Sequence, residues 1–537
     1  MIKRGLLLAV MLLLLTSCTA QGEKAVLQNQ SPVKDMNAIN KPEDKGKITE
    51  LYVTVLSQTN PENSGFTFKE LNDGKDIKLP VILREGNNGR TEESLSGYEA
   101  TGGNGTIKLR GQSARLAEEK SFKITLNEET WQGYKVINLN KHPFDSLKIR
   151  NKLSFDLFKE IPNVTCPGTN FIHLFIKDMT QAKDLQFQDF GLFTQVENID
   201  RYFLESHGLD SGGSLYKVEN FEFKRYPEVL KSKKELDYNK EKFEEILEIK
   251  GVGDHKKLLA MLNDVNNSFI HVNKVIDKNF DRQNYLTWLA INILTHNIDT
   301  TSRNFFLYNP QENSKWYFLP WDFDGGWGAD FKRARWQDGI SNYWGVTLHR
   351  RFLKNDKNRM ELSKKIEEIS GHFSEERIKL LLDTYDPIIQ NFVLNQKGLK
   401  QQELESVQNE FRLLPQSVEL NKERYYKSLE RPMPVFMGAP IKYGDYFVFT
   451  WENSYDFQGD LIEYGIDISR TPDFNDIIFS TEGLRENQCI VRDLPAGKYY
   501  WKLTIKDFQG NSQEAFDKYV NRATGLYYFG IKEFIIE

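Results

Sequence analysis

Two neighbouring stretches decide the fold: HNIDTTSRNFFLY at residues 296–308 and KWYFLPWDFD at residues 315–324. Each carries a short aromatic run, and the turn-forming residues between the runs predict a β-hairpin. Because the two strands of a hairpin return to where they began, we expect Asn304 and Asp322 to lie close together. The sequence therefore predicts that polar side chains gather at one end of this hairpin.

Asp299 stands just before the first predicted strand. It follows residues 282–294, which are apolar nearly all round and predict a buried helix. Phosphoryl transfer needs a carboxylate that orients the attacking hydroxyl and oxygen ligands for a metal ion. Protein kinases place four residues between an Asp and an Asn, followed by two strands and a metal-binding Asp-Phe-Gly. Asp299, Asn304 and Asp322 follow that spacing and order, although His296 precedes Asp299 by one residue more than the kinase histidine does.

Further motifs precede the hairpin in a fixed order. They are LRGQSAR at residues 109–115, KSFK at 120–123, RNKL at 150–153 and GLFTQVENID at 191–200. Together with the hairpin pattern Asp…Asn…Tyr…Pro-Trp-Asp-x-Asp, they resemble the CotH kinase family (spore coat protein H-like) over about residues 48–429. The resemblance implies an α+β fold, in which an atypical two-lobed protein-kinase-like domain is followed by a small β-sandwich.

The resemblance assigns roles to the polar residues around the hairpin. Asp299 would be the catalytic Asp. Asn304 and Asp322 would hold Mg²⁺ or Mn²⁺, and Asp324 would be a second ligand or a support. His296 is expected to be a structural histidine rather than a base.

The residues implied for nucleotide binding come from the earlier motifs. Lys123 or Lys120 would reach the phosphates of ATP from a strand, and Arg110 would do the same or brace the site. Glu197 would lie near the connection between the lobes or pair with a lysine. The sequence departs from the family pattern at Gln112, where an Asn is usual, and no complete glycine-rich loop precedes the lysines.

The N-terminus carries a targeting signal. A basic start and a short apolar run end in LTSC at residues 15–18, which resembles the lipobox of bacterial lipoproteins. We expect residues 1–18 to be a lipoprotein signal peptide with a lipidated Cys18, and residues 19–46 to be a disordered tether. The expected location is the bacterial cell envelope, lipid-anchored outside the cytoplasm, with the membrane as a partner through that lipid.

The remaining chain divides into two predicted domains. The kinase-like domain is expected over residues 47–431. Residues 432–537 follow a Pro-Met-Pro break, are rich in strand-forming residues, and resemble a fibronectin type III-like β-sandwich. Cys166 and Cys489 fall in different predicted domains, so we expect both to be unpaired packing residues.

Composition and motifs exclude several functions. The formal net charge of −5 lacks the basic excess of a nucleic-acid binder. The chain also lacks the Gly-x-Ser-x-Gly and His-Glu-x-x-His motifs of α/β-hydrolases and zincins. The first interpretation is an ATP- and Mg²⁺-dependent kinase acting on Ser or Thr of an envelope or surface protein. The alternatives are a non-catalytic envelope scaffold or adhesion lipoprotein, an irregular calcium site at residues 322–326, and a carbohydrate platform if Trp321 and its neighbours prove exposed.

Overall fold

The computed structural model describes residues 46–57, 65–87, 90–91, 103–128, 130–181, 186–328, 333–395 and 399–537. The predicted signal peptide, Cys18 and all but the last residue of the predicted tether lie outside the described residues. Within the described ranges, no helix is long and apolar enough to cross a bilayer.

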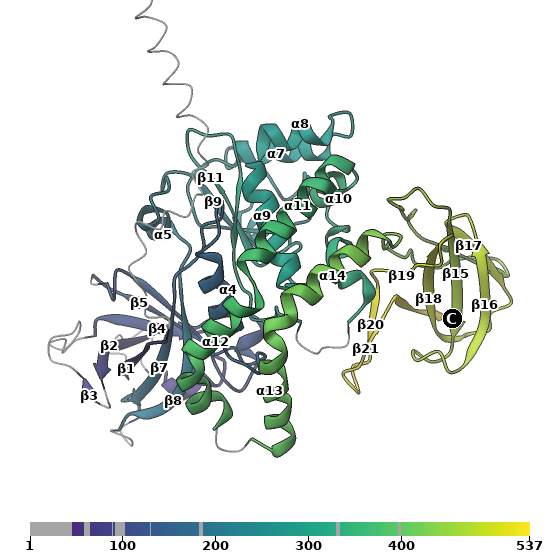
Figure 1. The fold of residues 1–537 in the computed structure, drawn as a ribbon. Coiled ribbons are helices and arrows are strands. Elements are labelled where there is room, and N and C mark those ends of the chain that lie inside the picture. Colours follow the sequence, from purple (N-terminus) through teal and green to yellow (C-terminus); the bar gives the residue numbers. More distant parts are fainter. Residues whose placement is uncertain are drawn as a thin grey trace, which may run out of the picture.

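The N-terminal part is a β-sheet that closes into a ring (Figure 1). The strand order is β1-β7-β8-β6-β5-β4-β2-β3, and β1 pairs with β2 as well as with β7, so that only the short β3 stands outside the ring. Closure leaves few open sheet edges. The strands are β1 (Ile48–Val55), β2 (Leu79–Asn87), β3 (Arg90–Thr91), β4 (Gly105–Leu109), β5 (Phe122–Leu126), β6 (Val136–Asn140), β7 (Thr169–Asp178) and β8 (Gln188–Glu197).

Alternation along β4 and β5 separates an apolar face from a basic face. Ile107 and Leu109 join the hydrophobic cluster inside the ring. Successive strand residues point to opposite faces, so Lys108 points outward, and Lys123 of β5 lies directly opposite it. Arg110 extends the same outer face just beyond β4. The ring therefore presents three cations on one outer surface.

A helical part with a small sheet follows the ring. The sheet has the order β10-β9-β11-β12. Its strands are β9 (Ser214–Val218), β10 (Leu247–Ile249), β11 (Phe305–Asn309) and β12 (Tyr317–Pro320), which confirms the predicted hairpin. The helices are α4 (Arg150–Phe158), α5 (Arg201–Ser206), α6 (Lys240–Glu244), α7 (Lys256–Asn266), α8 (Val272–Asn279), α9 (Arg282–Leu294), α10 (Thr347–Leu353), α11 (Asp356–His372), α12 (Glu375–Ile389), α13 (Gln401–Leu413) and α14 (Ser417–Leu429).

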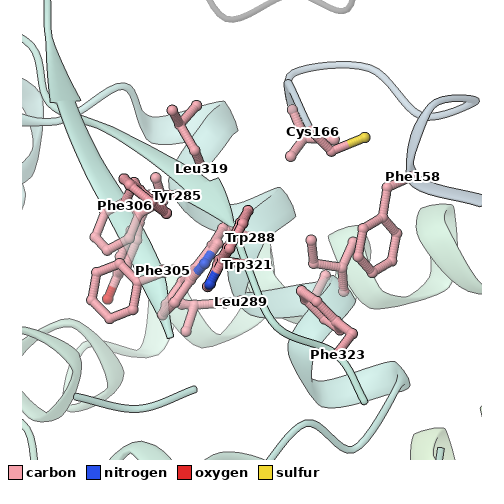
Figure 2. Close-up of a cluster of buried hydrophobic side chains, with 14 of the residues drawn as sticks. Phe158, Cys166, Tyr285, Trp288, Leu289, Phe305, Phe306, Leu319, Trp321 and Phe323 are labelled. Atoms are coloured by element: carbon pink, nitrogen blue, oxygen red, sulfur yellow. The ribbon is translucent and has the colours of Figure 1, made fainter. Parts of the chain in front are cut away.

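Helix α9 is the buried centre of this part, as its apolar sequence predicts. Every residue from Asn284 to Leu294 is buried. Figure 2 shows Trp288 of α9 among the aromatic side chains of the hairpin. Its ring centroid lies 4.9 Å from that of Phe305 and 4.6 Å from that of Phe318. The Asn284 side chain accepts a hydrogen bond from the Phe318 backbone N–H at 2.7 Å and donates to its carbonyl at 3.1 Å.

The C-terminal part forms its own hydrophobic cluster, from Val435 to Ile536. Two sheets supply it, β13-β14-β17 and β16-β15-β18-β19, with β22 also paired to β18, while β20 and β21 form a separate hairpin. The strands are β13 (Ile441–Tyr443), β14 (Tyr446–Thr450), β15 (Ile462–Ser469), β16 (Ile477–Leu484), β17 (Gln488–Arg492), β18 (Gly497–Asp507), β19 (Ser512–Glu514), β20 (Lys518–Val520), β21 (Tyr527–Phe529) and β22 (Ile531–Ile536). Its likeness to a fibronectin type III domain stays a prediction.

Two expectations for local structure meet different outcomes. Charged helices over about residues 231–266 are expected from sequence, but the structure places β10 between α6 and α7, because this segment pairs with β9. Cys166 and Cys489 are buried and are not joined by a disulfide bond, as expected.

Trp288→Ala should destabilise the protein strongly. The substitution empties a fully buried site against Phe305 and Phe318. Deleting such a side chain costs about 3–5 kcal/mol. Urea unfolding followed by circular dichroism measures the loss. Phe269→Ala is the control, because Phe269 is 98% exposed; an equal loss in both variants would contradict the assignment of α9 as the core.

Candidate functional site

Asn304 and Asp322 lie at the same end of the hairpin. Phe305 pairs with Pro320, so the residues that flank this pair leave the two strands together. Both Asn304 and Asp322 adopt left-handed backbone conformations, with φ of 60° and 61°. Non-glycine residues rarely do so, and such conformations cluster at functional sites.

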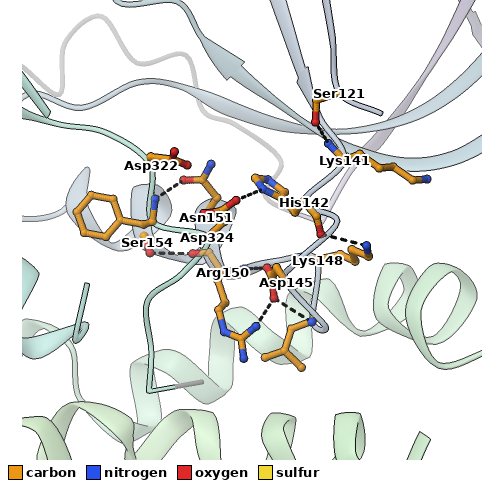
Figure 3. A network of polar contacts seen from close by, with 12 residues as sticks. Ser121, Lys141, His142, Asp145, Lys148, Arg150, Asn151, Ser154, Asp322 and Asp324 are labelled. Carbon is orange, nitrogen blue, oxygen red and sulfur yellow. Dashed lines mark hydrogen bonds and ion pairs between the residues drawn. The ribbon is translucent and has the colours of Figure 1, made fainter. Parts of the chain in front are cut away.

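The loop that carries Asp322 is held by two buried asparagines. The Asn297 side chain donates to the Asp322 carbonyl at 3.1 Å. The Phe323 backbone N–H donates to the side-chain oxygen of Asn151, from α4, at 3.2 Å (Figure 3). These bonds fix the turn from both neighbouring elements, so the acidic loop is pre-organised.

Asp299 faces this acidic loop. Its Oδ2 lies 3.9 Å from the position that a Cβ would take at Gly325, so the carboxylate sits against the residues that follow Asp324. Asp299 keeps contact with solvent. Partial desolvation raises the pKa of Asp299; the charge of Arg303 lowers it, and that of Asp324 raises it. The structure thus brings the predicted catalytic carboxylate to the predicted metal loop.

Asp322 and Asp324 form a coupled acidic pair. Burial, and then the charge of Asp324, raise the pKa of Asp322. Burial alone would raise the pKa of Asp324, but contacts with His142 and Asp322 outweigh it and lower that pKa. Nδ1 of His142 lies 3.2 Å from Oδ2 of Asp324 (Figure 3). Two adjacent, partly buried carboxylates repel each other, and a cation relieves that repulsion.

Arg110 reaches this pair from the ring. The charges of Asp322 and Asp324 raise its pKa, while the stronger effect of burial lowers it. The guanidinium lies 5.9 Å from the Trp321 ring centroid. Its Nη1 is buried without a hydrogen-bond partner among the described residues. Buried polar atoms normally have a partner, so this nitrogen keeps the capacity to donate to a ligand.

The donor set fits a hard divalent cation. Among the described residues, no three His, Cys, Asp or Glu side chains converge as a ready metal cluster. Asn304 and Asp322, with Asp324 behind them, offer amide and carboxylate oxygens, and these are the ligands that Mg²⁺ and Mn²⁺ prefer. The mutual repulsion of the acidic pair supports the same assignment.

The structure separates the two candidate lysines. Lys123 points from the outer face of the ring, where burial and then the charges of Lys250, Lys108 and Arg110 lower its pKa to about 8. Lys120 instead donates a hydrogen bond to the Arg115 carbonyl at 2.7 Å. Lys123 therefore belongs to a group of cations, whereas the ammonium of Lys120 is held in a local turn.

Glu197 is a structural anchor. Its Oε2 accepts from the Gly168 backbone N–H at 2.9 Å and lies 3.0 Å from Nε2 of His207. The residue ends β8, just before α5, so it lies where the ring joins the helical part. Neither of these partners is the lysine expected from the sequence as an alternative partner of Glu197.

His296 and the tryptophans are packing residues. His296 is buried, its Nε2 lies 3.5 Å from Oδ1 of Asp338, and burial lowers its pKa. Trp321, Trp327 and Trp344 are buried, and the half-buried Trp336 packs against Phe516, with ring centroids 5.4 Å apart. A carbohydrate platform would need exposed aromatic rings, and these tryptophans are not exposed.

Sequence reasoning missed several residues of the site. His142 and Asn297 carried no signal, because their roles depend on contacts between distant segments. Lys250 is missed because it follows β10, a strand that pairs with the distant β9 in a segment expected to be helical. Asn151 lies in the RNKL motif at residues 150–153, which carries part of the family resemblance. This motif was the signal in the sequence that pointed to Asn151.

Fold and site together define a mixed α+β protein with acidic residues at kinase-like spacing. The chain belongs to the CotH kinase protein family, whose model matches residues 107–430. This confirms the family expected from sequence. The match begins in β4, so β1, β2 and β3 lie outside it.

Two known proteins are similar to this chain. Inner spore coat protein H of Bacillus subtilis (strain 168) is 29% identical over 235 residues, which cover 43% of this chain and 60% of that protein. The chain thus matches less than two thirds of that relative's length. The crystal structure of the Helicobacter pylori proinflammatory kinase CtkA aligns with 57% of this chain and 94% of its own, at 10% identity and a TM-score of 0.26, which is too low to establish a shared fold.

Asp322→Asn should stabilise the metal-free protein and abolish its response to metal. Because the pKa of Asp322 is raised in the folded state, ionising this group costs stability as the pH rises from acid toward neutral. Removing its charge should therefore add about 1 kcal/mol at neutral pH. Calorimetry with and without Mn²⁺ measures both effects.

Asp383→Asn, on the exposed face of α12, is the matched control. It should keep the wild-type melting temperature and the wild-type rise with Mn²⁺. A variant Asp322→Asn that melts earlier than wild type, or that gains as much from Mn²⁺, would contradict the assignment of the metal loop.

Proposed function

We propose that the protein is a CotH-like atypical kinase that transfers the γ-phosphate of ATP to Ser or Thr of an envelope or surface protein. The observation that carries the proposal is the position of the Asp299 carboxylate against the Asp322–Asp324 loop, with Asn304 at the same end of the hairpin. A scaffold has no physical need for this costly grouping of acids.

Each residue has a role in this proposal. Asp299 accepts the proton of the acceptor hydroxyl and orients its oxygen, and its raised pKa suits a general base. Asn304 and Asp322 hold Mg²⁺ or Mn²⁺, and Asp324 supports Asp322. Such an ion, when bound, neutralises charge on the phosphates of ATP.

The outer face of the ring binds the nucleotide phosphates. Lys123 of β5, Lys108 of β4 and Arg110 just after β4 supply positive charge, and Lys250, just after β10, adds to it. We propose that ring and helical part act as two lobes, which a hydrogen bond from Gln112 Nε2 to Glu219 Oε2, at 3.4 Å, links. Gln112 thus fills a joining role where the family usually has Asn.

The cellular setting follows from the sequence signal and from the relative. A lipid on Cys18 would anchor the protein outside the cytoplasm, and the similarity to a spore coat protein supports an envelope or coat location. The acceptor would then be a protein of that compartment, where the supply of ATP limits the reaction.

Asp299→Asn should abolish phosphate transfer and keep metal binding. The amide cannot accept the hydroxyl proton, and a general base contributes about 10²–10⁴-fold in rate. Transfer from labelled ATP with Mn²⁺ to the chain itself or to a generic Ser-rich protein measures it, with Asp383→Asn as the control. Wild-type protein that neither transfers phosphate nor binds ATP with metal would contradict the kinase and favour the scaffold.

Lys123→Gln should weaken ATP binding about tenfold, whereas Lys120→Gln should leave it unchanged. One charge-assisted contact to phosphate has about this strength. Because the pKa of Lys123 is about 8 in the free protein, wild-type affinity should also fall as the pH rises from 7 to 9, and Lys123→Gln should lack this part of the decline. Calorimetric titration with ATP measures the affinity of each variant. Equal losses of ATP affinity in both variants would contradict the assignment of Lys123 to the nucleotide phosphates.

A further inference from the structure

The C-terminal part is connected to the catalytic loop by a short series of contacts. Asn342 donates to the carbonyl of Ile298, next to Asp299, at 3.2 Å. One residue earlier, Oγ of Ser341 accepts from the Gln513 side chain at 3.3 Å. Gln513 belongs to β19 of the C-terminal part, so two residues join the predicted catalytic Asp to that part.

A second set of contacts joins the same two parts of the chain. The Arg335 backbone N–H donates to Oε2 of Glu514 at 3.2 Å, and its side chain bonds Ser512. The Trp336 ring centroid lies 5.4 Å from that of Phe516. Residues 333–343, which come soon after the Asp322–Asp324 loop, are therefore packed against residues 512–516.

Lys518 follows directly on this contact. It begins the hairpin β20–β21, which stands off the C-terminal sheets on the side toward the rest of the chain (Figure 1). Lys518 is exposed, and so is Arg303 of the catalytic loop. Neither has an ion pair with any residue that the structure describes, and the charges of both act on Asp299.

A cavity of about 770 Å³ opens beside this hairpin. Its charged lining residues are Lys498, Asp517, Lys518, Arg522, Lys532 and Glu533. The ammonium of Lys498 pairs with Glu533 at 2.6 Å, and that of Lys532 pairs with Asp517 at 3.1 Å. Lys518 and Arg522 remain as excess positive charge, so the cavity favours an anionic occupant.

We propose that the C-terminal part forms one wall of the acceptor site, and that Lys518, with Arg303 and Arg522, selects an acceptor segment with acidic residues beside its reacting hydroxyl. That the bound segment is a phosphate acceptor rests on the proposed function, whereas the binding of an acidic peptide to this basic surface does not. The contacts from Ile298 to Gln513 keep this wall in register with Asp299. Lys518 is a specificity residue in this arrangement and takes no part in the chemical step.

The test is binding of a fluorescent peptide that carries one Ser among glutamates, measured by anisotropy on the full chain. A peptide with the glutamates replaced by lysines is the comparison. We expect the acidic peptide to bind preferentially and Lys518→Glu to weaken it about tenfold, because the reversal replaces attraction by repulsion. Arg522→Glu should act in the same direction.

Lys442→Glu is the matched control, since Lys442 is an exposed lysine of β13 in the same part; it should bind like wild type. Preference for the basic peptide, equal binding by Lys518→Glu, or Lys518-dependent binding of anionic lipid vesicles without binding of the peptide would overturn the proposal.

Phosphate transfer to the same peptide separates the claim of an acidic-peptide site from the claim of kinase activity. If Lys518-dependent binding occurs and transfer does not, the basic peptide-binding surface stands and the kinase fails. Where transfer occurs, Lys518→Glu should raise KM for the acidic peptide and leave KM for ATP unchanged.

Discussion

The pair of hydrogen bonds between the Asn284 side chain and the backbone of Phe318 is the constraint on which the site depends. It fixes the buried helix α9 to the middle of β12, so hairpin and helix behave as one unit. Asp299 follows the C-terminal end of α9 and Asp322 follows the end of β12, so the packing of helix on hairpin brings the two residues to the same end of this unit. An amide that satisfies both backbone groups of a buried residue specifies register more sharply than apolar contacts do.

The charges around the site determine what this arrangement can bind. Two carboxylates, Asp322 and Asp324, are partly buried beside one histidine and beside a guanidinium whose Nη1 has no hydrogen-bond partner among the described residues. Such a grouping costs stability in the free protein and is relieved by an added cation. The basic outer face of the ring provides the opposite charge, so the molecule presents acidic and basic surfaces that suit a metal-bound polyphosphate.

Much of this could be predicted from the sequence, for physical reasons. Helix α9 is apolar on all faces, and the hairpin alternates aromatic strands with a turn, so both local elements are encoded by nearby residues. The closure of the ring through β1, the strand β10 and the partners of Asp324 depend on contacts between distant segments, and periodicity carries no information about them. Glu197 illustrates the same limit: its position was predicted, but its partners, Gly168 and His207, come from other segments. Sequence also leaves open the choice between Lys120 and Lys123, which only the local turn around Arg115 decides.

The central claim is that Asn304 and Asp322 hold a metal ion that meets the nucleotide in front of Asp299. The most direct measurement is a crystal structure with Mn²⁺ and a non-hydrolysable ATP analogue, with Mn²⁺ located by its anomalous scattering. We expect an anomalous peak bound by side-chain oxygens of Asn304 and Asp322, with the phosphates extending toward Arg110 and Lys123. A nucleotide bound elsewhere on the chain, or Mn²⁺ held without either of these two side chains, would contradict it.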